Sequence, residues 1–306
     1  MSRVSKIFID GEAGTTGLEI RQKLAGQPGI ELISIDPERR KDPQARADMM
    51  READLVVLCL PDAAAKEAVA IMDGLGADAP RVVDASTAYR VDPDWVYGFA
   101  ELAPDQKARI AAAKRVSNPG CYPTGAIALL RPLVEKGLLP RDYPVTVNAV
   151  SGYSGGGRQM IEAYEAGAAP SFELYGLGLE HKHMPELQSY AKLTRRPIFA
   201  PSVGNFRQGM IVSVPLHLDL LSGGAKAADI EAALSEWYGQ GGLVTVAPTA
   251  GIERIEAEAL NGTDRLELCV FANDARGQAV LVARLDNLGK GASGAAVQNI
   301  GIMLGL

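Results

Sequence analysis

Strand-like and helix-like segments alternate along the first 117 residues of this 306-residue chain. Apolar runs typical of strands occupy residues 4–10, 31–36, 54–60, 81–84 and 115–117. The run at 54–60 is almost continuously apolar, as expected for a parallel strand that is covered on both faces. The order of elements predicts an α/β fold with a Rossmann-like, doubly wound parallel sheet.

A glycine-rich turn separates the first strand from the first helix. It reads Gly-Glu-Ala-Gly-Thr-Thr-Gly over residues 11–17 and is followed by a helical pattern from Leu18. Glycines allow the backbone to approach a pyrophosphate, and the helix N-terminus favours its charge. The spacing G-x-x-G-x-x-G differs from the common G-x-G-x-x-G fingerprint, so it is a weak signal alone. The predicted cofactor contacts here are Gly11, Gly14, Thr15, Thr16 and Gly17.

The end of the second strand carries two conflicting signals about the cofactor. Asp36 is the acid expected to bind the free ribose hydroxyl of NAD, whereas Arg39, Arg40 and Lys41 suit the 2′-phosphate of NADP. The basic residues could also form a solvated loop. Three consecutive cations at this point, together with the family resemblance given below, favour NADP, with Arg39 and Arg40 as contacts.

The pattern changes after residue 143, where strand-like segments with period-two alternation become frequent. They occupy residues 145–150, 211–218, 243–247, 265–272 and 279–285. This pattern predicts an α+β domain with a mainly antiparallel sheet, and the family resemblance given below implies that it is the catalytic and dimerisation domain. We expect a nucleotide-binding domain over 1–119 and 286–306 and a catalytic domain over 120–285.

Cys121 lies in a polar turn, Ser-Asn-Pro-Gly-Cys-Tyr-Pro-Thr over residues 117–124, that opens an apolar helix. The helix dipole and the unpaired amides there favour a thiolate, which predicts a pKa below the usual value of about 8.5. Most cysteines are inert core residues, and Cys59 and Cys269 fit that description because they lie within strand-like runs. Cys121 is therefore the candidate nucleophile.

His181 and His183 are two of only three histidines in the chain. Thioester chemistry needs a proton carrier with a pKa near 7, which histidine supplies. In an extended segment the two rings would point in different directions, so one of the two is expected to reach Cys121. A metal site is the alternative, yet no third ligand is evident, and we predict no metal.

These motifs resemble the N-acetyl-gamma-glutamyl-phosphate reductase family, in its shorter variant. The turn around Cys121 resembles the family's active-site signature, and the segment 181–186 resembles its His-x-His-x-Pro-Glu motif. Segments 86–90, 151–158 and 286–299 extend the likeness along the chain. Ala88 departs from the family pattern, where aspartate is common, and leaves the role of its loop open.

The resemblance implies further site residues. It implies that Arg207, Ser151, Arg90 and Glu186 contact the substrate, and that Pro61, Ser86 and Asn287 contact the cofactor. Arg90 could equally bind phosphate or pair with a surface acid. It also implies NADPH-dependent reduction of an acyl phosphate, a small molecule, through a cysteine thioester in arginine biosynthesis, by a homodimer or homotetramer.

Two alternatives remain open from the sequence. Aspartate-semialdehyde dehydrogenase shares the layout of cofactor domain, cysteine and later histidine. A regulatory protein that binds the cofactor but has lost the chemistry would keep the fold without a reactive Cys121.

Composition excludes several other classes of function. The formal net charge of −6 gives no reason to expect a nucleic-acid partner. No stretch approaches the roughly 20 apolar residues of a membrane span, so no membrane association is expected. Three cysteines without paired or metal-binding spacing suit a reducing, cytoplasmic compartment.

Overall fold

The computed structural model describes residues 4–239 and 241–306, and it divides into two compact units. The first unit comprises the chain up to Pro119 together with Ala292–Leu306, and the second comprises Gly120–Gly291. Residues 286–291, which the sequence assigned to the nucleotide-binding domain, group with the second unit. Each unit is described separately below.

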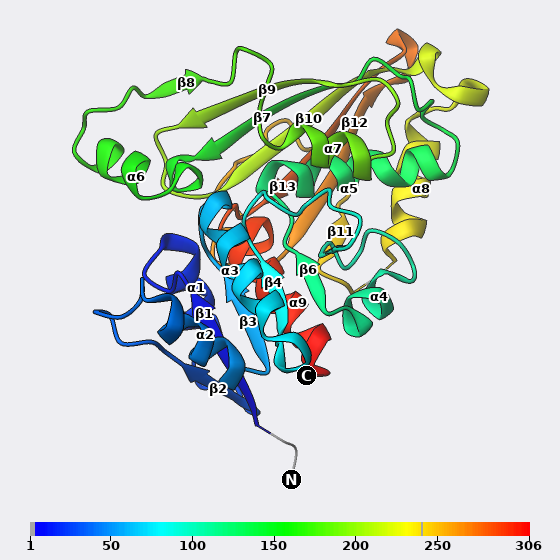
Figure 1. Ribbon diagram of the computed structural model, residues 1–306. Helices are drawn as coiled ribbons and strands as arrows, with labels where there is room; N and C mark the ends of the chain where they lie inside the picture. The colour runs from blue at the N-terminus through cyan, green and yellow to red at the C-terminus, as the bar shows by residue number, and fades with distance from the viewer. Residues whose placement is uncertain (1–3, 240) are drawn as a thin grey trace. The chain divides into compact units, whose positions relative to one another are not determined.

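The first unit is built on a six-stranded, all-parallel sheet with strand order β2-β1-β3-β4-β6-β5 (Figure 1). Its strands are β1 (Ser5–Asp10), β2 (Ile30–Ile33), β3 (Leu55–Leu58), β4 (Arg81–Asp84), β5 (Val96–Tyr97) and β6 (Arg115–Ser117). The four residues of β3 are completely buried, as expected for a strand inside a two-sided core. The predicted Rossmann-like sheet is confirmed.

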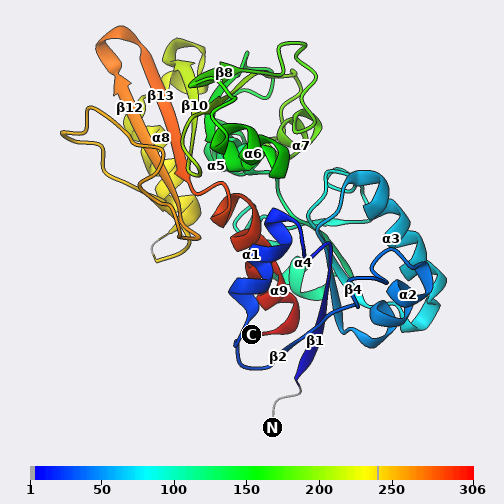
Figure 2. The same ribbon diagram turned by 90° about the vertical axis from the view of Figure 1, so that its left-hand side faces the viewer.

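Helices cover both faces of this sheet (Figure 2). They are α1 (Thr15–Leu24), α2 (Pro43–Glu52), α3 (Asp62–Gly74), α4 (Gln106–Ala112) and α9 (Gly294–Leu304). One core cluster joins α1, α4 and α9 to the sheet through residues such as Ile20, Ile110 and Ile300. A second cluster joins α2 and α3 to the opposite face through Met50 and Val69.

The carboxyl ends of the parallel strands are level with one another. Asp10 of β1 lies beside Leu58 of β3, which lies beside Asp84 of β4, which lies beside Ser117 of β6. The loops that follow these residues therefore leave the same edge of the sheet, the edge at which such folds bind ligands.

A buried ion pair fastens α2 to the end of β1. The guanidinium of Arg46 donates to Oδ2 of Asp10 through Nη2 at 2.6 Å and Nε at 3.1 Å. Both side chains are about nine-tenths buried. Burial raises the pKa of the Asp10 carboxyl, and the hydrogen bond from Arg46 opposes that rise.

The second unit contains a seven-stranded sheet with strand order β11-β12-β13-β10-β7-β9-β8 (Figure 1). Four of its strand pairs are antiparallel and two are parallel, so the sheet is mainly antiparallel, as predicted. Its strands are β7 (Thr146–Gly152), β8 (Phe172–Leu174), β9 (Ile198–Gly204), β10 (Met210–His217), β11 (Val244–Val246), β12 (Leu266–Asn273) and β13 (Gln278–Leu285).

Helices cover one face of this second sheet. The helices of the unit are α5 (Cys121–Glu135), α6 (Arg158–Glu165), α7 (Met184–Tyr190) and α8 (Ala227–Tyr238). α5 packs on β10 and β13, and α8 packs on β11 and β12. Along β10, Met210, Val212, Val214 and Leu216 are buried against these helices, while the alternate residues remain partly or fully exposed. This alternation is that of a sheet with one covered face.

Three irregular segments leave the second sheet at a common edge. Gly152 at the end of β7 pairs with Gly204 at the end of β9, and Met210 at the start of β10 pairs with Leu285 at the end of β13. Met210 also pairs with Ser151. The segments that begin after residues 152, 204 and 285 are thus neighbours. The last of them continues into a π-helical turn, Gly289–Ser293.

The helices of the described residues were also compared with the length and hydropathy that a membrane span requires. Within residues 4–239 and 241–306, none of them is long and apolar enough to cross a membrane.

The Asp10–Arg46 pair leads to a stability prediction. Arg46→Ala leaves a buried carboxylate without its cation and should lower the free energy of unfolding by about 3–5 kcal/mol at pH 7. Without Arg46, the pKa of Asp10 rises further. The loss in free energy of unfolding should therefore become smaller as the pH falls through this raised pKa, because the carboxyl then takes up a proton. Denaturant unfolding at pH 7 and pH 5 measures both effects.

Arg51→Ala is the matched control on the same helix. Arg51 pairs with Asp48 at the surface, with about half of each side chain exposed, and its loss should cost less than about 1 kcal/mol. Equal losses for the two variants would contradict the role given to the buried pair.

Candidate active site

Cys121 is the first residue of α5, as the sequence predicted. Gly120 is the N-cap and has an extended backbone, so no side chain caps the helix. The thiol is partly exposed, whereas the eleven residues after Tyr122 are mostly buried. Backbone amides at a helix N-terminus and the helix dipole make this a position where a negative sulfur is stabilised.

The other two cysteines have a different environment. Burial raises the pKa of the Cys59 thiol to about 12 and that of Cys269 to about 11. Cys269 lies within β12 and is buried. Both thiols are therefore protonated and unreactive near neutral pH, in agreement with their interpretation as packing residues.

The two histidines lie together and not apart. Residues 182 and 183 form a turn before α7, so the extended segment considered in the sequence analysis is absent. The ring centroids of His181 and His183 are 4.7 Å apart, and each lies 6.0 Å from the ring of Tyr122. Both imidazoles are thus packed against the residue that follows Cys121.

The hydrogen bond at His181 assigns its tautomer. Nδ1 of His181 accepts the backbone N–H of His183 at 3.1 Å, which requires an unprotonated Nδ1. Burial, with a smaller contribution from Lys182, lowers the pKa of His181 to about 4. The neutral ring therefore carries its proton on Nε2 at pH 7.

Glu186 is buried in the first turn of α7. Its Oε1 accepts the backbone N–H of Gly120, the residue before Cys121, at 2.7 Å. This bond joins the helix that follows the histidines to the turn that carries Cys121.

A pair of tyrosines continues the same buried cluster. The hydroxyl of Tyr175 donates to that of Tyr122 at 3.0 Å, and the hydroxyl of Tyr122 donates to the carbonyl of Ser202 at 3.1 Å. Burial raises the pKa of both hydroxyls, to about 12 for Tyr175, so they remain protonated donors.

Ser151 and Arg207 lie at the common edge of the second sheet. Ser151 is buried, and its hydroxyl donates to the carbonyl of Gly152 at 3.0 Å. Arg207 is exposed, and its Nη1 donates to Glu165 Oε1 at 2.6 Å. Each side chain of this ion pair is more than half exposed, so the guanidinium remains accessible from solvent.

The glycine turn of the first unit has the shape of a nucleotide cradle. Gly11 has φ +92°, and a Cβ there would collide with the carbonyl oxygen of Cys59. A Cβ at Gly17 would collide with the carbonyl oxygen of Gly11. Gly14 is the N-cap of α1, and Thr15 and Thr16 begin this ten-residue helix. The turn therefore presents helix-start amides beside backbone that lacks side chains, which fits a pyrophosphate.

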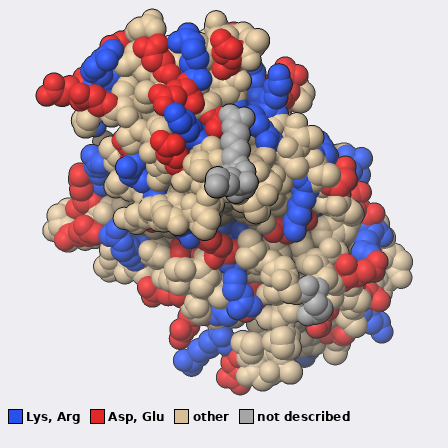
Figure 3. Space-filling model, turned by 90° about the horizontal axis from the view of Figure 1, so that it is seen from below, with Lys and Arg blue, Asp and Glu red and all other residues tan. Residues whose placement is uncertain are grey.

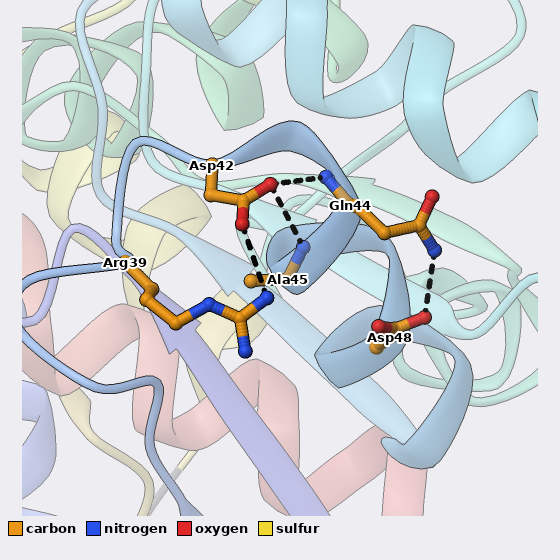
Figure 4. Close-up of polar contacts among 5 residues, drawn as sticks. All are labelled: Arg39, Asp42, Gln44, Ala45 and Asp48. Atoms are coloured by element: carbon orange, nitrogen blue, oxygen red, sulfur yellow. Dashed lines mark hydrogen bonds and ion pairs between the residues drawn. The ribbon is translucent and has the colours of Figure 1, made fainter.

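The basic loop after β2 has a defined internal structure (Figure 4). Nη2 of Arg39 donates to Asp42 Oδ2 at 3.0 Å, while Asp42 Oδ1 caps α2 by accepting the amides of Gln44 and Ala45. These contacts lower the pKa of the Asp42 carboxyl. Arg40 and Lys41 are exposed.

Asp36, the residue expected in an NAD site, is engaged by its own turn. Its Oδ1 accepts the backbone N–H of Glu38 at 2.9 Å. The carboxylate thus stabilises the loop on which the cations lie.

The remaining sequence-predicted residues fall in both units. Pro61 is the N-cap of α3. Ser86 is buried, and its hydroxyl donates to Asp84 at 2.6 Å. Arg90 is buried in the first unit and donates to the carbonyl of Ala85 at 3.2 Å. Asn287 lies in the second unit, where its carboxamide contacts Ser154 and Gly209.

Comparison with known proteins identifies the family. A model of the semialdehyde dehydrogenase NAD binding domain matches residues 6–110, and one of the semialdehyde dehydrogenase dimerisation domain matches residues 121–287. An N-acetyl-gamma-glutamyl-phosphate reductase of Brucella ovis is 56% identical, covering 98% of this chain and 99% of its own. One from a Chelativorans species is 57% identical, with 98% of each covered. The chain belongs to the N-acetyl-gamma-glutamyl-phosphate reductase family.

Solved structures similar to this reductase-family chain share its fold at low identity. Aspartate semialdehyde dehydrogenase II of Vibrio cholerae has a TM-score of 0.73 at 14% identity, covering 99% of both chains. The enzyme of Candida albicans, solved with NADP, has a TM-score of 0.64 at 15% identity, covering 98% of both chains.

Sequence reasoning missed several residues of the reductase-family site. Glu165 contacts Arg207, which is 42 positions away, and Tyr175 contacts Tyr122, which is 53 positions away. No local motif indicates such contacts. Asp42 could have been found, because an aspartate directly before a proline is typical of an N-cap followed by the first residue of a helix.

The unusual pKa of His181 gives a prediction for solution. His181 should stay neutral, with its proton on Nε2, until the pH falls to about 4. Because its folded pKa lies below the ordinary 6.5, the unfolded chain binds the proton first, and stability should fall between about pH 6.5 and 4. Imidazole nitrogen NMR of the three histidines reports the tautomer and titration, with His181→Gln assigning the signal. A resonance titrating near pH 6.5 with the proton on Nδ1 would contradict the assignment.

Proposed function

We propose that this protein catalyses the NADPH-dependent reduction of N-acetyl-L-glutamyl 5-phosphate to N-acetyl-L-glutamate 5-semialdehyde, with release of phosphate, in arginine biosynthesis. The observation that carries the proposal is the position of Cys121 at the first residue of α5, with both histidine rings against the adjacent Tyr122. The relatives at 56–57% identity carry the name of this activity.

In the proposed reaction the Cys121 thiolate attacks the acyl carbon of the substrate. A carbon–sulfur bond forms, the carbon–oxygen bond to the phosphoryl group breaks, and inorganic phosphate leaves. Cys121 begins α5, so amides of the first turn of this helix can stabilise the oxyanion that develops there. The product of this half-reaction is a thioester on Cys121.

The second half-reaction converts the thioester to the aldehyde. NADPH, when bound, supplies the hydride that reduces the thioester carbon. His181 Nε2–H, or the ring of His183, donates a proton to the oxyanion that hydride addition leaves, and takes it back as the carbonyl re-forms. The carbon–sulfur bond then breaks, which releases the semialdehyde and restores the thiolate.

Arg207 is proposed to hold the substrate. A guanidinium is the natural partner of a carboxylate, and Arg207 already binds one in Glu165. The acidic substrate would replace Glu165 as partner. Ser151, Arg90 and Glu186 remain proposed substrate contacts from the family resemblance.

NADP is the proposed cofactor, on the evidence of the loop after β2. Asp36 is engaged by the Glu38 amide, while the exposed cations Arg39 and Arg40 are suited to a 2′-phosphate. The glycine turn, Pro61 and Ser86 complete the proposed cofactor contacts, and the family resemblance alone implies Asn287 as a further one. Matching of residues 6–110 to an NAD binding domain supports the assignment of this unit to the nucleotide.

A paired assay tests the proposal against reduction of aspartyl phosphate. Phosphate-dependent oxidation of N-acetylglutamate semialdehyde and of aspartate semialdehyde is followed with NADP and with NAD. We expect kcat/KM to be at least about 100-fold higher for the acetylated substrate, because a site built for one polar substrate rejects another strongly. Equal or reversed preference would contradict the proposed substrate.

Cys121→Ala in the same assay tests the mechanism. Turnover should fall by at least about 10³-fold, because loss of a nucleophile removes covalent catalysis, while NADP binding persists. Cys269→Ala is the matched control, since this buried thiol lies within β12 and should be dispensable. Near-normal turnover of Cys121→Ala would rule out the thioester. In the wild-type protein, slow alkylation of Cys121 by iodoacetate that substrate does not prevent would support the regulatory alternative.

We also propose that the protein is a homo-oligomer, most simply a dimer, in the cytoplasm. The sheet of the second unit has a face opposite α5 and α8, the open sheet face, which carries Asn148, Val150, Ile211, Ser213, Pro215, Phe271 and Val280. All of these side chains are at least partly exposed, and five are apolar. The match to a dimerisation domain over 121–287 supports a second copy as the occupant. The three cysteines form no disulfide within the described residues, which suits a reducing compartment.

Sedimentation velocity of a Val280→Lys variant tests the open sheet face. A charge buried in an apolar interface should raise the dissociation constant at least about tenfold. Leu18→Lys, at an exposed apolar position on α1 in the first unit, is the control and should leave association unchanged. A wild-type monomer at about 10 µM, or equal association of both variants, would contradict this interface.

A further inference from the structure

Asp286 and Asn287 form a buried polar junction in the second unit. Each is 2% exposed and follows directly on β13. Oδ1 of Asn287 accepts the backbone N–H of Gly209 at 2.8 Å, and its Nδ2 donates to the hydroxyl of Ser154 at 2.9 Å. The Asp286 carboxylate accepts from Gln208 Nε2, Gly262 N and Leu288 N at 2.8–2.9 Å.

The two loops that Asn287 joins are also bonded to each other. The amide of Gly152 donates to the carbonyl of Gly209, and the amide of Ser154 donates to the carbonyl of Arg207, both at 2.9 Å. A Cβ at Gly152 would lie 2.6 Å from the Arg207 carbonyl oxygen, so only glycine permits this approach. The carbonyl of Arg207 is therefore bound by the amide of Ser154, and the amide of Gly209, two residues further along the loop, is bound by Asn287.

The same junction extends to the nucleophile. The amide of Gly291 donates to the carbonyl of Asp286 at 3.0 Å, which closes the π-helical turn. A Cβ at Gly291 would lie 3.0 Å from Cβ of Cys121, so the turn packs directly against the cysteine backbone. Asp286 and Asn287 thus connect Cys121 to the loops of Ser154 and Arg207 within one unit.

We propose that Asn287 is a positioning residue for the acyl phosphate substrate: it fixes the Arg207 loop relative to Cys121. The inference rests on the proposed function, since it takes Cys121 and Arg207 as reacting and substrate-binding groups. An asparagine suits the task because its planar carboxamide offers an acceptor to the Gly209 amide and a donor to the Ser154 hydroxyl. The Gly209 N–H can only donate, which assigns the oxygen to that side.

This role differs from the cofactor contact that the family resemblance implies for Asn287, and kinetics distinguishes the two. If Asn287 positions Arg207, its loss should raise KM for N-acetylglutamate semialdehyde and leave KM for NADP unchanged. If it binds the cofactor, the KM for NADP should rise instead.

The experiment compares Asn287→Ala and Asn287→Asp in the phosphate-dependent oxidation assay. Alanine leaves two buried groups unpaired and should lower kcat/KM for the semialdehyde roughly 10- to 100-fold, mainly through KM. Aspartate keeps the acceptor for Gly209 and can accept from Ser154, so it should give an intermediate value even if the alanine variant folds poorly. Both variants should keep KM for NADP within about twofold.

Gln106→Leu is the matched control for burial. Gln106 carries a fully buried carboxamide in the first unit, and it donates to the carbonyl of Tyr97. This variant should lose thermal stability without a change in KM for the semialdehyde.

The proposal is overturned if both Asn287 variants keep the wild-type KM for the semialdehyde, or if only KM for NADP rises. It is also overturned if Gln106→Leu raises the semialdehyde KM as much as Asn287→Ala does. Absence of activity in the wild-type protein would instead contradict the proposed function, so the two failures are distinguishable.

Discussion

The hydrogen bond from the Gly120 amide to the Glu186 carboxylate is the constraint on which the arrangement of the active site depends. Gly120 is the N-cap of α5, and Glu186 belongs to the first turn of α7, whose N-cap is His183. One hydrogen bond of 2.7 Å therefore joins the start of α5, where Cys121 lies, to the start of α7, which His183 caps. Both groups are buried, so after loss of this hydrogen bond the Glu186 carboxylate and the Gly120 amide could not replace it with one to water. The loss would therefore reduce the free energy of unfolding.

The packing around this bond explains why the histidine rings lie together. α7 packs on α5, which places the turn before α7 beside Tyr122. The aromatic rings of Tyr122, Tyr175 and Phe199 then surround His181. These rings partly bury His181 and thereby lower its pKa, whereas the backbone amide of His183 donates to its Nδ1. The position and the protonation state of His181 thus both depend on the packing of α7 against α5.

The sequence predicted the features that depend on local patterns. Continuous apolar runs located β1, β3 and β4, and a polar Gly/Pro turn before an apolar stretch located the start of α5 at Cys121. The sequence did not predict α2, α7 or the π-helical turn at Gly289–Ser293. α2 is largely polar and α7 has only seven residues, so neither has a strong apolar period. These elements are held by distant partners, such as Asp10 for α2, and tertiary contacts decide them.

The candidate site residues also divide into those found by local sequence patterns and those whose contacts depend on the tertiary fold. Cys121 and Arg207 lie in motifs that could be recognised, but their contacts with Gly291 and Glu165 join positions far apart in the chain. The meeting of those loops follows from strand register, because β7, β9 and β13 all end at one edge of the second sheet. Register depends on pairing along the whole strand with partners that are distant in the sequence, which local motifs do not reveal.

An acidic protein that binds anions needs local sources of positive potential. The chain carries a net charge of −6, and Lys and Arg are interspersed with Asp and Glu on the face shown in Figure 3. Its proposed anion contacts are helix N-termini at α1 and α5 and two exposed arginines that already hold carboxylates, Arg39 with Asp42 and Arg207 with Glu165. Exposed ion pairs of this kind contribute only about 0–1 kcal/mol, so an incoming phosphate or carboxylate can replace the internal partner at little cost. In the proposed function, the internal carboxylates orient these two arginines until an anionic ligand takes their place, which reconciles a net negative charge with binding of acidic ligands.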